Sequence, residues 1–338
     1  MLSRVANSLY WMSRQIERAE NVARIVDVNF QLLLDFRSIN DRRLAEHWMP
    51  IVQSTGDEEL FRTLYKDATG QNVTEFLTFR TENPNSIITS IAQARENARM
   101  VRDQITREMW EEINRIYLFL KSPKATEVWK VTPDEFFHEI KSSSLLLQGL
   151  CDATIPHTEG WNFMQVGKFI ERADKTTRII DVRYQSFPDH GVPAGSSQMD
   201  TLEWAAVLRS CSAWDAYRQQ FGADVDPKKV VAFLTLDEDF PRSVIFSVIQ
   251  LNHALRRISG VPEGRFINNA EKLAGRLVAE LQFSTIEEIF DVGLHGYLDQ
   301  LQLKLNNIGA AMFDAYIFQQ FNNPEAEMMV QQEEQQQQ

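Results

Sequence analysis

The segment Ile16-Glu17-Arg18-Ala19-Glu20-Asn21-Val22-Ala23-Arg24-Ile25-Val26-Asp27-Val28 has a second copy, Ile170-Glu171-Arg172-Ala173-Asp174-Lys175-Thr176-Thr177-Arg178-Ile179-Ile180-Asp181-Val182. Each residue of the second copy lies 154 positions after its counterpart, as Glu171 does after Glu17. Acid, base, alanine and acid recur in the same order, and an arginine and an aspartate follow at matching places. We call these segments the two motif copies, and they indicate an internal duplication.

Each motif copy is typical of a helix turning about 100° per residue. In the first copy, Glu17, Glu20, Arg24 and Asp27 share a narrow sector opposite the apolar residues, and the second copy repeats this charged stripe. Arg18, like Arg172, lies near the edge of the apolar face instead. A solvated charged face is the simplest interpretation of the stripe. A functional interpretation gains weight because the second copy keeps the acids and Arg178 while Lys175-Thr176-Thr177 replaces the residues between them.

Three further correspondences keep nearly the same spacing of 156 or 157 residues. They join Trp48 with Trp204, Phe76-Leu77-Thr78 with Phe233-Leu234-Thr235, and the segment beginning at Pro84 with the one beginning at Pro241. A register held over several elements predicts a tandem duplication of a unit of about 155 residues. We therefore expect helical repeats at residues 1–155 and 156–323, packed as one domain about a pseudo-twofold axis. The glutamine-rich residues 324–338 are expected to be a disordered tail.

The composition favours a soluble, almost entirely helical protein. Of 338 residues, 43% are hydrophobic and 24% charged, only 14 are glycine and 11 proline, and no extended β-type alternation stands out. The net charge of −12 disfavours nucleic-acid binding. No apolar run approaches the roughly 20 residues that span a bilayer. The N-terminus lacks a signal-peptide pattern, so a cytoplasmic location is expected. Cys151 and Cys211 are expected to be buried reduced thiols.

The apolar spacing also predicts individual helix boundaries. It predicts a long helix from about residue 3 to 36, a helix at about 42–54, and a helix from 86 that continues or restarts near 109. Residues 122–132 and 188–197 are expected to be loops because they contain proline. Residues 284–318 are expected to be helical.

Three interpretations of the charged residues remain open. In the first, Arg18 and Arg172 are buried and pair reciprocally with Glu171 and Glu17 of the other copy, which clamps the halves together. In the second, arginines of both halves converge on one cleft that binds a peptide or amino acid. Its candidate ligand-binding residues are Arg18, Glu20, Arg24, Arg95, Glu96, Asn97, Arg99, Arg172, Asp174 and Arg178, and Arg256 is a further arginine considered for the cleft. In the third, carboxylates bind a metal, but the paired Glu-x-x-His motifs of such bundles are represented only by Glu135 and His138.

Catalytic signatures are scarce. The six histidines are scattered, and neither a nucleophile elbow nor a phosphate-binding glycine loop is present. Glu17 and Glu171 are the candidates for acid/base catalysis, and no metal or cofactor is expected. A catalytic role would require a concave pocket where the motif copies meet and a carboxylate with a raised pKa.

The motifs together resemble the bacterial alpha-E family, a domain of unknown function named for its Glu-Arg motif. The resemblance rests on Leu2 to Met12 with the first motif copy, on Asn83 to Ile87 with Ala94 to Arg99, on Gly160-Trp161 and Gly167 with the second copy, and on Pro241 to Val244. It runs from Met1 to about Phe318. One departure is Ser13, where the family commonly has glycine.

The resemblance implies an all-helical protein encoded beside a circularly permuted ATP-grasp protein and often a transglutaminase-like protein. The implied context is a system that forms amide or peptide bonds. We therefore expect a non-catalytic helical partner or scaffold of an ATP-grasp amidoligase, which binds the ligase, a peptide or amino-acid ligand, or both. The alternative is an enzyme that acts on a peptide or amino-acid conjugate with Glu17 or Glu171 as acid/base.

Overall fold

The structure is a computed structural model that describes residues 1–36, 48–185, 198–262 and 264–318. All regular secondary structure in these ranges is helical, which confirms the all-α prediction. None of their helices contains a stretch long and apolar enough to cross a membrane.

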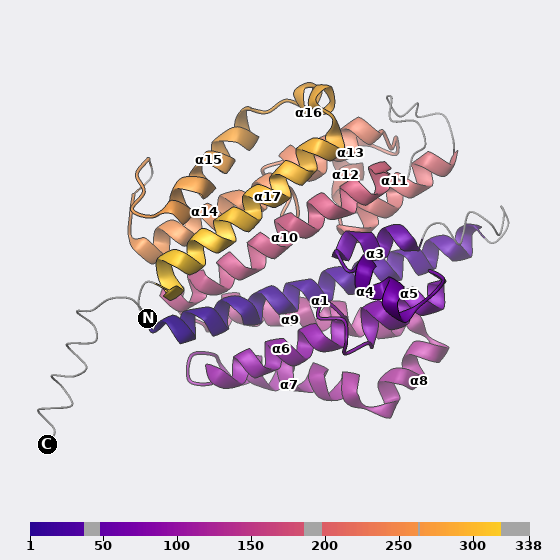
Figure 1. Cartoon of the computed structure of the whole chain (residues 1–338), viewed down its shortest axis with the longest axis horizontal. Helices are drawn as coiled ribbons and strands as arrows, with labels where there is room; N and C mark the ends of the chain where they lie inside the picture. Colours follow the sequence, from indigo (N-terminus) through magenta and orange to yellow (C-terminus); the bar gives the residue numbers. More distant parts are fainter. Residues whose placement is uncertain (37–47, 186–197, 263, 319–338) are drawn as a thin grey trace, which may run out of the picture.

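Two long central helices carry the motif copies. They are α1 (Ser3–Phe36) and α10 (Glu159–Gln185), and they lie side by side through the middle of the molecule (Figure 1). The remaining helices of the first half are α3 (Met49–Thr55), α4 (Glu58–Leu64), α5 (Gly70–Thr78), α6 (Ile87–Met100), α7 (Arg107–Lys121), α8 (Pro123–Val131) and α9 (Pro133–Thr154). Those of the second half are α11 (Gln198–Ser210), α12 (Trp214–Phe221), α13 (Pro227–Leu236), α14 (Val244–Ser259), α15 (Asn269–Phe283), α16 (Ile286–Val292) and α17 (Leu294–Phe313), and a π-helical turn, η1 (Asp314–Phe318), follows.

The two halves use the same helix order and the same contacts. In the first half α6 and α9 pack on α1, and in the second half α14 and α17 pack on α10. The contacts between halves are reciprocal, because α3 reaches α10 and α11 reaches α1. Local capping is repeated as well: Ser86 caps α6 and Ser243 caps α14 through a side-chain oxygen that accepts a backbone N–H. These repeated features are those of a duplicated bundle with pseudo-twofold symmetry.

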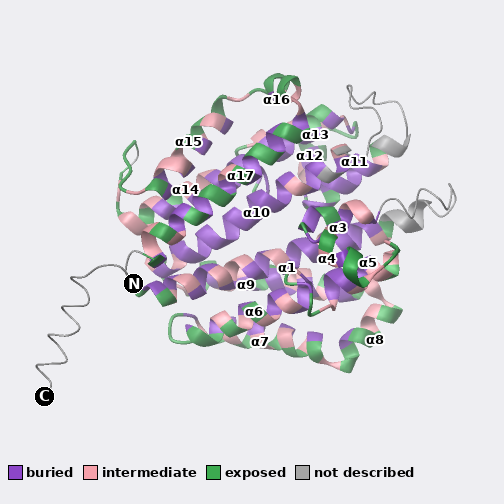
Figure 2. Ribbon diagram, viewed as in Figure 1, coloured by how far each residue is buried: buried purple, intermediate pink, exposed green. Residues whose placement is uncertain are grey.

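The central helices are buried on nearly all sides. Figure 2 shows α10 enclosed by its neighbours, and every residue from Asn162 to Thr177 is buried. At its crossing with α1, a side chain at Gly167 would place its Cβ 2.2 Å from the carbonyl oxygen of Tyr10. Glycine therefore permits the closest approach of the two helices. Ser13 occupies the equivalent position in the first motif helix, 154 residues earlier.

Several boundary predictions need correction. Residues 122–132, expected to be a loop, form α8, because Ser122 caps the helix and Pro123 stands in its first turn, where its missing N–H costs nothing. The helix expected from residue 86 ends at Met100, and α7 restarts after the cap Thr106. The helix expected over 284–318 is divided at Gly293, whose φ of 95° breaks the helical path. Residues 42–47 of the second expected helix, the loop 188–197 and the tail 324–338 lie outside the described residues.

Candidate functional site

The two motif copies meet through two crossed Glu–Arg pairs. Arg18 donates from Nε to Glu171 Oε1 at 2.6 Å and from Nη2 to Oε2 at 2.9 Å. Arg172 donates from Nε to Glu17 Oε1 at 2.8 Å and from Nη2 to Oε2 at 2.9 Å. Both pairs are bidentate, the geometry in which arginine and carboxylate bind most strongly. The predicted reciprocal clamp between the halves is therefore confirmed.

The Glu171 carboxylate is fully enclosed by cations. Its side chain is 0% exposed, and besides Arg18 it accepts a hydrogen bond from Arg14 Nε at 2.7 Å. Lys175 Nζ lies 3.9 Å away. Burial by itself would raise the pKa of Glu171, but the charges of Arg18, Arg14 and Lys175 hold it well below its ordinary value. Glu171 is therefore a fixed anion near neutral pH and a poor proton donor or acceptor.

Glu20 is equally enclosed, on the other side of the clamp. Its Oε1 accepts from Arg24 Nε at 2.8 Å and from Arg242, and its Oε2 accepts from Ser144 Oγ at 2.6 Å. Burial again opposes ionisation, but Arg242 and Arg24 lower the pKa of Glu20 to about 2. The charged stripe of the motif is thus buried, and its interpretation as a solvated face is wrong.

A further cation lies beside each motif copy, and both of these residues belong to the second half of the chain. Near the first copy, Arg242 Nη1 lies 3.3 Å from both Glu17 Oε1 and Asn21 Oδ1. Near the second copy the cation is Lys175, the counterpart of Asn21, whose buried ammonium lies 3.7 Å from Asp174 Oδ2. Burial lowers the pKa of Lys175. The cation beside the second copy thus lies in the motif helix α10 itself, whereas the cation beside the first copy comes from the turn before α14.

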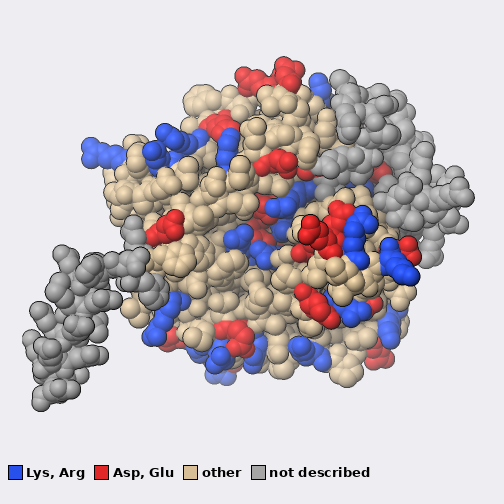
Figure 3. Space-filling view, viewed as in Figure 1, with Lys and Arg blue, Asp and Glu red and all other residues tan. Residues whose placement is uncertain are grey.

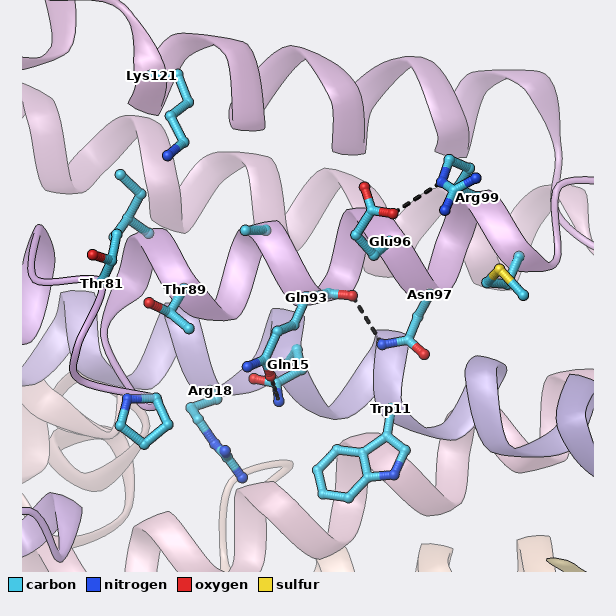
Figure 4. A pocket seen from close by; sticks show the side chains of 14 residues that line it. Trp11, Gln15, Arg18, Thr81, Thr89, Gln93, Glu96, Asn97, Arg99 and Lys121 are labelled. Carbon is cyan, nitrogen blue, oxygen red and sulfur yellow. Dashed lines mark hydrogen bonds and ion pairs between the residues drawn. The ribbon is translucent and has the colours of Figure 1, made fainter.

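An open groove runs beside the clamp, between α1 and α6. Its volume is about 780 Å³, and Figure 4 shows its walls. It is lined by Trp11, Gln15, Arg18, Thr81, Pro84, Ile88, Thr89, Ala92, Gln93, Glu96, Asn97, Arg99, Met100 and Lys121. We call it the first groove. Arg18 connects it to the clamp, since its Nη1 donates to Asn85 Oδ1 at 2.8 Å while Nε and Nη2 bind Glu171.

The walls of the first groove carry both amide and charged side chains, and Figure 4 shows Arg18 beside the amide of Gln15. Gln15 Nε2 donates to Gln93 Oε1 at 2.6 Å, and Asn97 Nδ2 donates to the carbonyl oxygen of Gln93 at 2.8 Å. Gln15 Oε1 is buried without a hydrogen-bond partner in the described part of the chain, so the wall holds an acceptor whose bonding capacity is unmet. Glu96 pairs with Arg99 at 2.9 Å, and Lys121 stands near the opposite end.

The arginines expected to converge on one cleft are divided among several places. Arg18 and Arg99 line the first groove, with Glu96 and Asn97. Arg95 leaves it: its Nε binds Asn114 Oδ1, and its guanidinium stacks on Tyr117 at 4.7 Å. The other candidates belong to the buried charged network of the two motif helices, namely Glu20, Arg24, Arg172, Asp174 and Arg178. Figure 3 shows basic and acidic side chains that also reach the surface near the line between α10 and α1. The expectation of a single shared cleft is therefore wrong.

The residues considered for metal binding do not assemble. Glu135 accepts from Thr132, and His138 contacts Ser142 on the exposed face of α9. Within the described ranges, three possible metal ligands do lie close to one another, namely Asp181, His295 and Asp299. This group lies outside the clamp and includes neither Glu17 nor Glu171.

Sequence reasoning missed several residues of the network and the groove. Arg14, Arg242, Ser144 and Gln148 all bind the motif acids, as when Gln148 Nε2 donates to Glu20 Oε2 at 3.0 Å. Arg242 had no signal in the repeat, because its counterpart is the neutral Asn85. Gln15 and Gln93 were missed as groove residues because they are uncharged and their positions in the helices do not distinguish them from other polar residues.

These features define an all-α protein whose two repeats are joined by buried, crossed Glu–Arg pairs and flanked by an open polar groove. The chain belongs to the Alpha-E family, described as a predicted alpha-helical domain with a conserved ER motif, whose profile matches residues 1–317. The clamp contains two Glu-Arg dipeptides, Glu17-Arg18 and Glu171-Arg172.

Similar proteins that are longer than this chain occur in mycobacteria. Uncharacterized proteins of Mycobacterium bovis and Mycobacterium tuberculosis are 23% identical to it over 326 residues, which cover 92% of this chain and 36% of each relative. The chain thus spans about a third of the length of these curated relatives. No solved structure matches it.

Proposed function

We propose that this protein is a non-catalytic helical partner of an ATP-grasp amidoligase, and that its first groove binds a peptide segment of the ligase or of the ligase's product. The observation that carries this proposal is the closed clamp. Because the carboxylates of the motif are engaged by arginines, the motif joins the halves, and recognition is left to the groove beside it. The ATP-grasp context comes from the resemblance to the family, in which a transglutaminase-like protein is a further expected partner.

The groove has the dimensions and chemistry of a site for an extended peptide. From Thr89 to Met100, α6 rises about 16 Å at about 1.5 Å per residue, which is the length of about five extended residues. The amides of Gln15, Gln93 and Asn97 are suited to peptide N–H and C=O groups. The side chain of Lys121 suits a carboxylate, and Glu96 suits an amine. Mixed charge of this kind favours a peptide or amino acid over a ligand of one sign.

The acid/base alternative has less support. It requires a motif carboxylate that exchanges a proton near neutral pH, whereas the pKa of Glu171 is lowered by Arg18 and Arg14 after the opposing effect of burial. The first groove also meets the motif through Arg18, and neither Glu17 nor Glu171 lines it.

Co-purification with the ATP-grasp amidoligase encoded in the same genome tests the proposal. We expect a complex with the intact chain and at least about tenfold weaker binding for Lys121→Glu, which reverses a charge in the groove. Lys130→Glu is the matched control, because Lys130 is also an exposed lysine in the last turn of a helix but lies outside the groove.

Two results would contradict the proposal. One is the absence of any complex with the ligase. The other is a complex that Lys121→Glu and Lys130→Glu weaken equally, since binding would then depend on general surface charge and not on the groove.

A further inference from the structure

The internal duplication places a second groove between α10 and α14. It has a volume of about 530 Å³. Gln165, Phe169 and Gln250 line it at the positions equivalent to Trp11, Gln15 and Gln93 of the first groove, by the offsets of 154 and 157 residues. We call it the second groove. It lies between the helix pair that corresponds, in the second half, to α1 and α6 of the first half, but different side chains line it.

The differences change the charge of the site. His253 stands where the first groove has Glu96, and Arg257 stands where it has Met100. Arg256, the counterpart of Arg99, is retained. Among the residues that the structure describes, the lining of the second groove therefore contains no acidic residue, while two adjacent arginines lie along one wall.

These arginines are held in place without a carboxylate. Arg256 Nη1 donates to the carbonyl oxygens of Pro262 at 2.8 Å and Arg265 at 2.7 Å, and Arg257 Nη2 donates to that of His157 at 3.4 Å. Neither arginine forms an ion pair with any residue that the structure describes, although the protein carries a net charge of −12. In the first groove, by contrast, Arg99 forms an ion pair with Glu96 at 2.9 Å, and Arg95 contacts the same carboxylate at 3.0 Å. Within the described part of the chain, the second groove thus has two arginines that no carboxylate pairs with.

The remaining wall is suited to a peptide. Trp161 and Phe169 supply aromatic surface. Asn162 lines the same groove, is 2% exposed, and holds a side-chain oxygen with no donor among the described residues. A peptide N–H that reached this oxygen after a small side-chain rotation would satisfy a buried acceptor. The stretch from Gln250 to Arg257 rises about 10 Å at about 1.5 Å per residue, enough for about three extended residues.

We infer that the second groove is a binding site for a short acidic peptide segment, whose carboxylates pair with Arg256 and Arg257. This site is separate from the first groove and does not depend on the ligand bound there. The protein would then carry two unlike sites, one of mixed charge and one cationic, on the two halves of a single duplicated frame.

Fluorescence anisotropy with labelled triglutamate tests this inference on the full chain. We expect triglutamate to bind, triglutamine of the same length to bind at least about tenfold more weakly, and the triglutamate affinity to fall as salt is raised. Arg257→Glu is expected to weaken triglutamate binding at least about tenfold, and the milder Arg257→Gln to weaken it less. Circular dichroism checks that both variants remain folded, which their exposed position favours.

The matched control is Lys121→Glu, which makes the same change of charge in the first groove. It should leave triglutamate binding within about twofold of that of the unaltered chain. The inference is overturned if Arg257→Glu binds triglutamate as well as the unaltered chain does, if triglutamine binds equally, or if Lys121→Glu is the variant that loses binding. Because Lys121→Glu and Arg257→Glu report on different grooves, failure here leaves the test of the first groove unaffected.

Discussion

Replacing Glu171 by glutamine removes the charge at the centre of one crossed pair while keeping the size of the side chain. The amide can accept hydrogen bonds through its oxygen alone, and its NH2 group would face the guanidinium groups of Arg18 and Arg14, which also donate. Three charge-assisted hydrogen bonds now reach this carboxylate. The substitution therefore leaves two arginines without their main counter-charge.

The expected cost follows from the burial of these partners. Removing one member of a buried ion pair typically destabilises a protein by about 3–5 kcal/mol. The arginine side chains are 14% exposed for Arg18 and 18% exposed for Arg14, so water can partly compensate them. We expect Glu171→Gln to lower the free energy of unfolding by about 3 kcal/mol, the lower end of that range.

Urea unfolding followed by circular dichroism measures this change. The control is Glu111→Gln, which also removes a carboxylate paired with an arginine, Arg107. Those two side chains are 56% and 80% exposed, and a pair of this kind contributes at most about 0.5 kcal/mol. If Glu171→Gln were as stable as Glu111→Gln, the argument that the motif acids hold the halves together would be refuted.

Three further predictions concern the same packed interior. The pKa of Glu20 is about 2 in the folded chain against an ordinary 4.5, so its contribution to stability is present above about pH 4.5 and lost as the pH falls toward 2. The urea midpoint of unfolding should therefore decrease when it is measured from pH 6 down to pH 3. A midpoint that rises over this range would contradict the prediction. Gly167→Ala should destabilise the protein by about 1–3 kcal/mol in thermal unfolding, because the added Cβ meets the carbonyl oxygen of Tyr10. The control Gly149→Ala has open space around its Cβ and should be neutral or stabilising by up to about 1 kcal/mol. Equal effects of the two substitutions would argue against the close helix crossing. Burial raises the pKa of both cysteine thiols to about 12, so a thiol reagent at pH 8 should label them only as fast as the chain opens, and rapid labelling of the folded chain would show that they are not buried.

The sequence carried enough information for the helical class, the duplication and the reciprocal pairing. The pairing was predictable because Arg18 and Arg172 fall near the apolar edge of their helices, where a buried guanidinium needs a carboxylate, and each repeat offers one to the other. The sequence does not predict α8, because a proline such as Pro123 is a loop signal, although Ser122-Pro123 is also a common helix start.

The placement of ligand-facing residues was less predictable. Arg95 and Arg99 are four residues apart on α6, yet Arg95 turns to Tyr117 and Arg99 lines the first groove. Which of them faces the groove depends on how α6 is rotated against α1 and α7, and that rotation is set by packing over the whole interface. Arg242 contacts Glu20 for a similar reason, because the loop before α14 brings it to the first motif copy.

The central claim is that the Glu-Arg motif acts as a clamp between the repeats, and a double-mutant cycle between Arg18 and Glu171 tests it most directly. The free energy of unfolding is measured for the unaltered chain, Arg18→Gln, Glu171→Gln and the double variant. We predict that the double variant is more stable than the sum of the single losses implies, with a coupling free energy of about 2 kcal/mol. A coupling free energy near zero would show that the two residues contribute independently, and the clamp would then be contradicted.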